Sequence, residues 1–366
     1  MKKQEFKYLT LYETLKREIL SGGIPYGHKL PSKRVIASRY GLSILTVEHS
    51  IELLVYEGYV KPRERSGYFA VYKPGELFLS ESGRGKDRTA KGAEEGEEAR
   101  TPQRADRKID PFPFNTLSKA MRKVLLDRSE AVLSKSPNAG LVEFRKAISE
   151  YLIRNRGITA SPDQILIGSG AEYLYGLIVE AVGRGKIFGI EDPSYEKIRL
   201  VYERKGVTIE PMKLGEDGIV SEALNRSHAD VLHISPFRSY PSGVTAGASK
   251  KQEYLSWAKR GKRIIVEDDF ESEFSLLRKP EDTVYGLSGG KNVIYLNSFS
   301  RTVSPALRVG YMVIPKDLLE IFRQKVGFYS CTVPAFEQYL LTELLESGAF
   351  ERHLNRIRRN LRRTGE

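Results

Sequence analysis

One loop decides how this chain is interpreted: Ser298-Phe299-Ser300-Arg301-Thr302-Val303-Ser304-Pro305-Ala306-Leu307-Arg308-Val309-Gly310-Tyr311. It follows the apolar run 293–296, which has the composition of a buried strand. Doubly wound sheets bind their ligands at the carboxyl ends of such strands, where the chain turns into loops of small and polar residues. We therefore expect this loop, with Arg301 and Arg308, to face a ligand.

The region 109–366 alternates strand and helix patterns, which predicts an α/β domain with a mostly parallel sheet. Each predicted strand leads into a loop rich in Gly, Ser, Pro or Asp. Helices are predicted at 173–181 and, with a run of arginines, at 351–363. The predicted buried strands lie at 164–167, 231–234, 263–266 and 293–296.

Residues 1–72 are predicted to form three helices and then a short hairpin. Ser32 and Ser43 are the expected N-caps of the second and third helices, and Gly41 separates these two helices. The hairpin strands are predicted at 58–60 and 67–71, joined by a basic loop. This order favours a winged helix-turn-helix. Periodicity alone fits a small protein-interaction module equally well.

Composition narrows the classes of partner and compartment. The 366 residues carry a net charge of +12, which favours an anionic partner, nucleic acid first. A single cysteine, Cys331, fits a reducing cytoplasm, where we place the protein. Residues 73–108 hold nine basic and eight acidic side chains and few large apolar ones, so we predict a flexible charged linker. Neither a membrane span nor metal-ligand spacing is found, and we expect no membrane and no metal.

In a winged helix-turn-helix the third helix lies in the major groove of DNA. Ser43, Thr46 and His49 would then lie near its exposed N-terminal half, and the wing 63–67 would meet phosphate or the minor groove. Residues 1–72 contain 12 basic and 7 acidic side chains, a net charge of +5. Binding that weakens steeply with salt should follow from this charge.

Residues 9–72 closely resemble the GntR family of bacterial repressors. The resemblance rests on Gly27-His28-Lys29-Leu30-Pro31-Ser32-Lys33-Arg34, Gly41-Leu42-Ser43, Thr46-Val47, Glu57-Gly58-Tyr59 and Gly67-Tyr68. It implies a double-stranded DNA operator as the partner. Ile44 stands where the family usually has arginine, so the operator sequence or the affinity should differ. The residues that we assign to DNA contact are Lys33, Arg34, Ser43, Thr46, His49, Arg65 and Gly67.

Three further motifs follow predicted strands, and each has an ordinary structural alternative. Gly168-Ser169-Gly170-Ala171-Glu172 opens a helix and would cradle a phosphate, although many glycine-rich turns hold no ligand. Tyr195 would stack on a heterocycle or simply pack in the core or at the surface. Glu267-Asp268-Asp269 would bind a cation, form an acid/base pair or keep a pyridine nitrogen protonated.

In this order, and together with Asn138-Ala139-Gly140-Leu141, these motifs resemble the MocR subfamily of GntR regulators. Its members join a winged helix to a fold-type I aminotransferase-like domain. The resemblance implies pyridoxal 5'-phosphate (PLP) as cofactor, a homodimer, and domains at 1–72 and 109–366 around the linker 73–108. It also implies phosphate contacts, a ring stacked on tyrosine and a carboxylate at the pyridine nitrogen. The implied cofactor-binding residues are Ser169, Gly170, Ala171, Tyr195, Asp268, Ser298, Ser300 and Arg308.

Four departures from the family pattern change the expected chemistry. Arg301 occupies the position of the lysine that forms a Schiff base, and a guanidinium stays protonated and is a poor nucleophile, so we expect no catalytic residue. Phe270 replaces a tyrosine that donates to the cofactor's phenolic oxygen. The usual histidine-glutamine pair is replaced around Arg238-Ser239. We also expect the C-terminal small domain to be missing beyond Glu366.

The sequence therefore predicts a DNA-binding transcriptional regulator with a non-catalytic, degenerate PLP-fold effector domain, not an enzyme. PLP would bind weakly and without a covalent bond, and the effector would be PLP or a small amino-acid-like molecule. Two alternatives stay open. One is a truncated regulator that binds DNA but no cofactor, and the other is a PLP-dependent aminotransferase with an accessory DNA-binding module.

Overall fold

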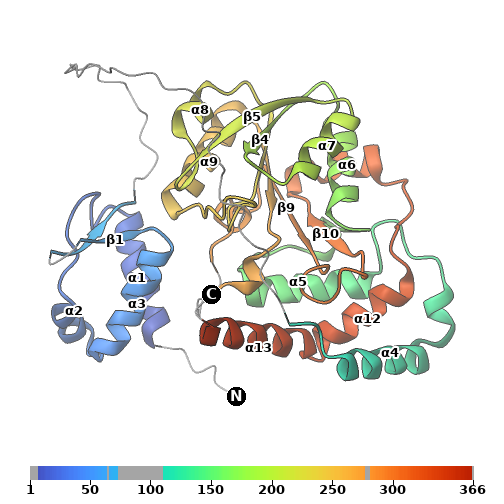
Figure 1. Cartoon of the computed structure of the whole chain (residues 1–366), viewed down its shortest axis with the longest axis horizontal. Helices are drawn as coiled ribbons and strands as arrows, with labels where there is room; N and C mark the ends of the chain where they lie inside the picture. The colour runs from blue at the N-terminus through green and yellow to red at the C-terminus, as the bar shows by residue number, and fades with distance from the viewer. Residues whose placement is uncertain (1–6, 64–65, 73–109, 277–280, 365–366) are drawn as a thin grey trace, which may run out of the picture.

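The chain folds into a small N-terminal domain and a larger domain that lie side by side (Figure 1). The structure is a computed structural model and describes residues 7–63, 66–72, 110–276 and 281–364. The predicted linker 73–108 and the predicted wing residue Arg65 lie outside these ranges. Within them, no helix combines the length and the apolar character that crossing a bilayer requires.

The small domain is a winged helix-turn-helix. Ser32 and Ser43 cap the second and third helices as predicted, since their hydroxyls accept from the backbone N–H of Val35 and Thr46. Gly41 ends the second helix in the left-handed region, at φ +61°, which glycine tolerates best. The elements are α1 (Lys7–Leu20), α2 (Lys33–Tyr40), α3 (Ile44–Tyr56), β1 (Val60–Arg63) and β2 (Gly67–Ala70).

The wing of this domain differs from the sequence-based prediction. The first strand was predicted at 58–60, yet β1 extends from Val60 to Arg63, where Arg63 pairs with Gly67 of β2. β1 includes Pro62, which an edge strand accommodates although proline has no N–H group. Some basic side chains of the predicted loop therefore lie on a strand, where the pairing of β1 with β2 fixes the backbone.

The larger domain is built on an eight-stranded sheet with the order β3-β10-β9-β8-β7-β4-β5-β6 in the described residues. The four pairs that join β9 to β8, β8 to β7, β7 to β4 and β4 to β5 are parallel. In contrast, β10 runs antiparallel to both of its neighbours, β3 and β9. The prediction of a mostly parallel sheet is thus confirmed. The strands are β3 (Ile165–Gly168), β4 (Ile187–Asp192), β5 (Thr208–Gly215), β6 (Gly218–Ile219), β7 (Val231–Ile234), β8 (Ile264–Asp268), β9 (Val293–Ser298) and β10 (Gly310–Val313).

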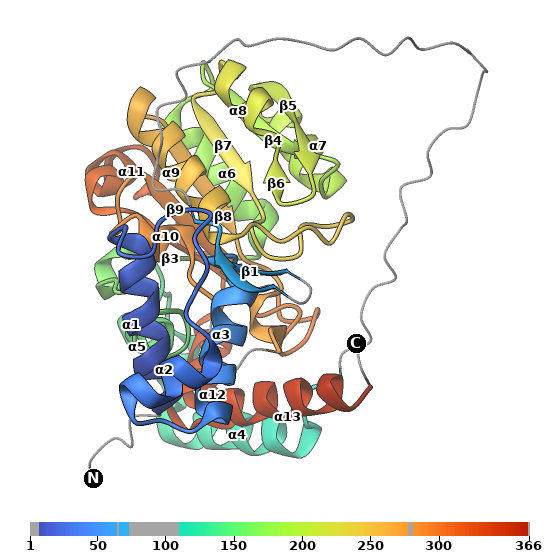
Figure 2. The same ribbon diagram turned by 90° about the vertical axis from the view of Figure 1, so that its left-hand side faces the viewer.

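Helices cover both faces of this sheet, and alternate strand residues enter the two hydrophobic cores that result (Figure 2). One face packs against α6 (Ala171–Val182), α7 (Glu196–Arg204) and α11 (Leu319–Val326). The other packs against α4 (Phe114–Arg128), α5 (Val142–Arg156), α9 (Ala248–Gly261), α12 (Ala335–Glu346) and α13 (Ala349–Thr364). The shorter helices α8 (Ser221–Arg226) and α10 (Val284–Leu287) complete the domain.

The two domains contact each other through a buried polar cluster. Lys16 of α1 forms an ion pair with Asp282 of the larger domain and lies 3.9 Å from Glu57. The Tyr12 hydroxyl donates to Glu57 at 2.5 Å, and the backbone N–H of Ala248 donates to the Glu57 carbonyl at 2.8 Å. Because Tyr12, Lys16 and Glu57 are all buried, this contact fixes α1 against Asp282 and the end of α3 against the start of α9.

Candidate ligand pocket and DNA-binding surface

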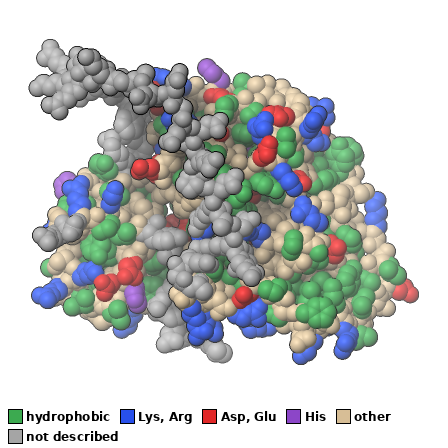
Figure 3. Space-filling model, viewed as in Figure 1, with side chains coloured by type: hydrophobic (Ala, Val, Ile, Leu, Met, Phe, Trp, Pro, Cys, Tyr) green, Lys and Arg blue, Asp and Glu red, His purple; other side chains and the backbone are tan. Residues whose placement is uncertain are grey.

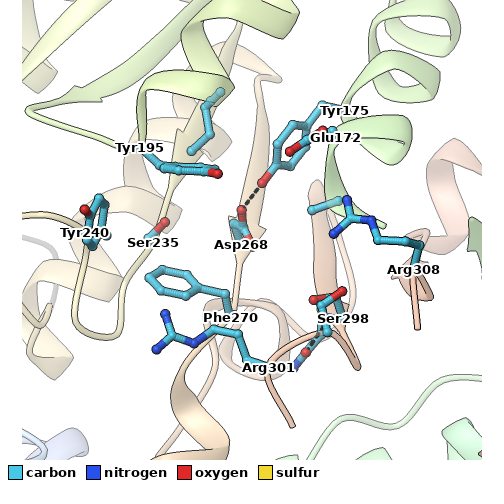
Figure 4. A pocket seen from close by; sticks show the side chains of 14 residues that line it. Glu172, Tyr175, Tyr195, Ser235, Tyr240, Asp268, Phe270, Ser298, Arg301 and Arg308 are labelled. Carbon is cyan, nitrogen blue, oxygen red and sulfur yellow. Dashed lines mark hydrogen bonds between the residues drawn. The ribbon is translucent and has the colours of Figure 1, made fainter. Parts of the chain in front are cut away.

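A pocket of about 290 Å³ lies at the carboxyl ends of the parallel strands (Figure 4). Loops after the strands and the first turn of α6 converge there, as expected for a doubly wound sheet. Six of the eight predicted cofactor-binding residues line it: Ala171, Tyr195, Asp268, Ser298, Ser300 and Arg308. The other lining residues are Glu172, Tyr175, Ile198, Ser235, Tyr240, Phe270, Asn297 and Arg301.

One end of the pocket is suited to a phosphate group. Gly170 precedes α6 at φ +95°, and a Cβ atom at this position would lie 2.9 Å from Nη2 of Arg308. The absence of a side chain at Gly170 thus lets the guanidinium approach the first turn of the helix. The helix N-terminus and the guanidinium together favour an anion. Ser169 and Gly170 do not line the pocket, and the Ser169 N–H donates to Thr332 Oγ1 at 3.1 Å.

The centre of the pocket holds a carboxylate and an aromatic ring. Asp268 ends β8, is 5% exposed, and accepts a hydrogen bond from the Tyr175 hydroxyl. Burial, with the nearby Asp268, raises the pKa of Tyr175 well above its ordinary value, so this hydroxyl stays a donor. Tyr195 precedes α7, and its ring meets that of Tyr240 edge to face, 6.0 Å between centroids. A pyridine ring between Tyr195 and Asp268 would meet both groups that PLP recognition uses.

Arg301, at the position where the family has its Schiff-base lysine, lines the pocket. It pairs with Glu271, with 3.1 Å between Nη2 of Arg301 and Oε1 of Glu271. The other carboxylate oxygen of Glu271 lies 2.9 Å from Nε of Arg238. One buried carboxylate therefore holds two guanidinium groups. Arg238 itself adopts a left-handed backbone, at φ +52°, which costs about 1–3 kcal/mol for a residue other than glycine. Surrounding contacts must hold it there.

Two further departures from the family pattern are Phe270 and Ser239, of which only Phe270 lines the pocket. Phe270 lines it without a hydroxyl, and the Arg301 guanidinium lies 6.0 Å from the centre of its ring. Ser239, which does not line the pocket, donates to Glu191 at 2.5 Å. Burial raises the pKa of Glu191 to about 8, partly offset by its hydrogen bonds from Ser239 and Ser235.

These residues fit PLP as a ligand but not as a covalently anchored cofactor. Arg308 with the first turn of α6 fits the phosphate, Asp268 fits the pyridine nitrogen, and Tyr195 fits the ring face. In enzymes PLP acts as an electron sink once it is joined to an amine. Arg301 offers no neutral amine for that bond.

The predicted DNA-contacting residues gather at the start of two helices. Arg34 is exposed in the first turn of α2, and Ser43 is the exposed cap of α3. Thr46 lies one turn into α3, with its hydroxyl 2.8 Å from that of Ser43. Ile44, which replaces the family arginine, is 49% exposed beside them. This arrangement presents the N-terminal end of α3 to solvent, as major-groove reading requires.

Three other predicted DNA contacts have intradomain partners. Lys33 pairs with Glu48 at 2.5 Å, and this hydrogen bond raises its pKa. The His49 ring packs edge to face against Tyr8, with 6.1 Å between ring centroids. Gly67 lies at φ +106° over the Lys29 side chain. These residues lie in the same domain as Arg34 and Ser43, but the contacts described for them are with side chains of that domain.

Sequence reasoning missed several residues of the pocket. Tyr175, Glu271 and Tyr240 had not been assigned a role, and Arg238 had been noted only as a departure. Tyr175 is one helical turn from Ala171, so α6 itself places it in the pocket. Glu271 carries no such signal, because its contacts with Arg238 and Arg301 join three separate loops.

Comparison with protein families finds two matches. Residues 7–70 match the gntR family of bacterial regulatory proteins, and residues 110–364 match aminotransferase class I and II. The HTH-type transcriptional regulator YhdI of Bacillus subtilis is 30% identical over 96% of this chain and 75% of its own length. The probable rhizopine catabolism regulatory protein MocR of Rhizobium meliloti is 26% identical over 95% of this chain and 73% of its own.

Solved aminotransferases share the fold of the larger domain. The α-aminoadipate aminotransferase LysN of Thermus thermophilus superposes with a TM-score of 0.60 at 28% identity. The match covers 68% of this chain and 64% of that enzyme, so this chain spans less than two thirds of its length.

Proposed function

This chain belongs to the MocR subfamily of GntR-type regulators, and on that premise we propose that it senses a ligand without converting it. It is a DNA-binding transcriptional regulator whose effector domain has the aminotransferase fold. The observation that carries the proposal is Arg301, which lies in the pocket and pairs with Glu271 where an enzyme needs a lysine amine. We place the regulator in the cytoplasm, with its DNA operator.

We propose that PLP binds reversibly in this pocket. Arg308, Ser298, Ser300 and the first turn of α6 would hold the phosphate. Tyr195 would stack on the ring, and Asp268 would meet the pyridine nitrogen. Charge-assisted hydrogen bonds contribute about 1.5–3 kcal/mol each, enough for weak binding without a covalent bond. PLP itself or a small amino-acid-like molecule would be the effector.

A titration followed by absorption spectroscopy and equilibrium dialysis tests this proposal. PLP should bind, dialyse away completely, and bind at least about tenfold more weakly to Arg308→Gln. Arg184→Gln, an exposed arginine paired with Glu180, serves as the matched control. Amino-group transfer from a panel of amino acids should stay at the rate of free PLP. Absence of any binding would favour a regulator without a cofactor, and transfer above that rate would favour an enzyme.

We propose a homodimer, as the subfamily resemblance implies. Hydrophobic side chains gather at the lower right of Figure 3, over α4. Among the exposed residues of α4 and of the 3₁₀ turn after it, Leu126 and Leu133 are 75% and 87% exposed. Such a patch is typical of a protein interface. Sedimentation velocity at micromolar concentration should show a dimer. Leu126→Asp should shift the protein toward monomer, whereas the control Leu200→Asp, outside the patch, should not.

A further inference from the structure

The pocket presents a cationic group at each of two separate places. Arg308 lies at the phosphate end, and Arg301 lies on the other side of Asp268, below Phe270 (Figure 4). A ligand that spans the pocket therefore meets a guanidinium at both ends. A phosphate satisfies only one of them. The charge pattern favours a ligand that carries a second anionic group.

Glu271 orients Arg301 rather than removing it from the pocket. Its two oxygens take one arginine each, at 3.1 Å for Arg301 and 2.9 Å for Arg238, and the residue is 7% exposed. The Arg301 side chain keeps 28% of its surface exposed, compared with 12% for Arg238. A guanidinium has five N–H donors in a plane, so contact with Glu271 is compatible with a second acceptor. Arg301 lines the pocket and Arg238 does not, so we assign Arg238 a positioning role through Glu271.

We propose that Arg301, held by Glu271, is the subsite for the carboxylate of a phosphopyridoxyl amino acid, and that Arg238 positions Glu271. This inference rests on the proposed function, because it takes the phosphopyridine to lie between Arg308, Asp268 and Tyr195. Since Arg301 cannot supply an amine, the ligand brings its own amine, already bonded to the pyridoxyl carbon, and with it a carboxylate. A planar guanidinium matches a carboxylate through two parallel hydrogen bonds. No bond to the protein forms or breaks.

Two probes that differ in one group isolate this subsite. N-(5'-phosphopyridoxyl)-L-alanine and N-(5'-phosphopyridoxyl)-ethylamine share the phosphate, the ring and the amine, and only the first has a carboxylate. Both are secondary amines without an aldehyde, so neither reacts with a lysine. Calorimetric titration of the full chain should give at least about tenfold tighter binding of the alanine probe, as one charge-assisted pair provides.

Variants assign the difference to Arg301. Arg301→Gln should remove the discrimination between the probes and leave the affinity for the ethylamine probe within about twofold. Arg301→Lys, which keeps the positive charge, should retain part of the discrimination. Arg308→Gln should weaken both probes alike, because both carry the phosphate. Thermal unfolding of each variant shows whether it folds, and the comparison of the two probes on the unmodified chain needs no variant.

Each outcome decides a different claim. Equal binding of the two probes to the unmodified chain overturns the carboxylate subsite and leaves the proposed PLP site standing. Binding of neither probe overturns the proposed PLP site and the subsite with it. Discrimination that persists in Arg301→Gln and disappears in Arg238→Gln would move the subsite from Arg301 to Arg238 and contradict the assignment made here.

Discussion

The DNA-binding surface and the ligand pocket keep different parts of their family chemistry. Arg34, Ser43 and Thr46 remain at the exposed ends of α2 and α3, and only Ile44 departs from the family pattern there. The pocket keeps Arg308 and Asp268 but has Arg301 and Phe270 where the family has a covalent anchor and a hydroxyl donor. Binding functions tolerate such changes, whereas transamination does not, because it requires the amine. The difference supports the proposal that both places bind a partner and that neither converts one.

The largest expected effect is the appearance of a covalent bond. Treatment of the unmodified protein with one equivalent of PLP and then borohydride should label no single residue stoichiometrically, because the Arg301 guanidinium stays protonated and forms no imine. Arg301→Lys should gain one phosphopyridoxyl group per chain if the pocket is otherwise intact. Intact-mass spectrometry followed by peptide mapping measures both. Stoichiometric labelling of a single lysine in the unmodified protein would show that another amine has replaced the anchor.

The next largest effect concerns DNA. Arg34→Ala should weaken operator binding by about tenfold or more, as expected for one arginine contact worth about 1–3 kcal/mol. Gel shifts with DNA selected from a random library provide the measurement, with the distant Arg184→Ala as control. Affinity of the unmodified chain should fall steeply with salt. If Arg34→Ala and the unmodified chain bind alike, Arg34 does not contact DNA.

A smaller effect is expected at the contact between the domains. Asp282→Ala leaves Lys16 buried without that carboxylate and should cost about 2 kcal/mol. Hydrogen exchange followed by mass spectrometry should then show faster exchange in α1, with little change in α6. The exposed pair offers a control, because Glu222→Ala removes the partner of Arg226 at the surface. Unchanged protection of α1 would mean that the ion pair does not hold the domains together.

The smallest effect is a pH dependence of stability. Burial raises the pKa of Glu191 from 4.5 to about 8, so folding favours its protonated form. Its contribution is complete below about pH 4.5 and is lost as the pH rises through about 8. The midpoint of thermal unfolding should fall by about 4 °C between pH 6 and pH 8.5.

Glu191→Gln keeps a neutral hydrogen-bonding group and should flatten this slope, whereas the exposed Glu222→Gln should not. A slope equally steep in Glu191→Gln would assign the titration to another buried carboxyl. Glu267 and Glu273, whose pKa values burial raises to about 7, are the next to test.

The local sequence was sufficient to predict the helices and the hairpin of the small domain, and in the larger domain the strands β3, β7, β8 and β9 and the helices α6 and α13. Helix caps such as Ser32 and Ser43 act within one turn, and apolar strands such as 231–234 are marked by an uninterrupted run of residues. The strands β4, β5, β6 and β10 and the other helices of the larger domain were not predicted individually. β5 is flanked by half-exposed side chains, and its sequence includes a proline. Its strand conformation depends on pairing with β4, which lies earlier in the chain.

The sequence by itself determined that a lysine is absent at Arg301 and that phosphate-binding and DNA-binding motifs are present, because residue identity alone limits which reactions and contacts are available. Only the tertiary structure decided what Arg301 does instead. Glu271 reaches it from a different loop and also contacts Arg238 of a third loop, and no spacing along the chain predicts contacts of that kind. The same holds for Lys16 and Asp282, which are 266 residues apart and meet only because the two domains dock.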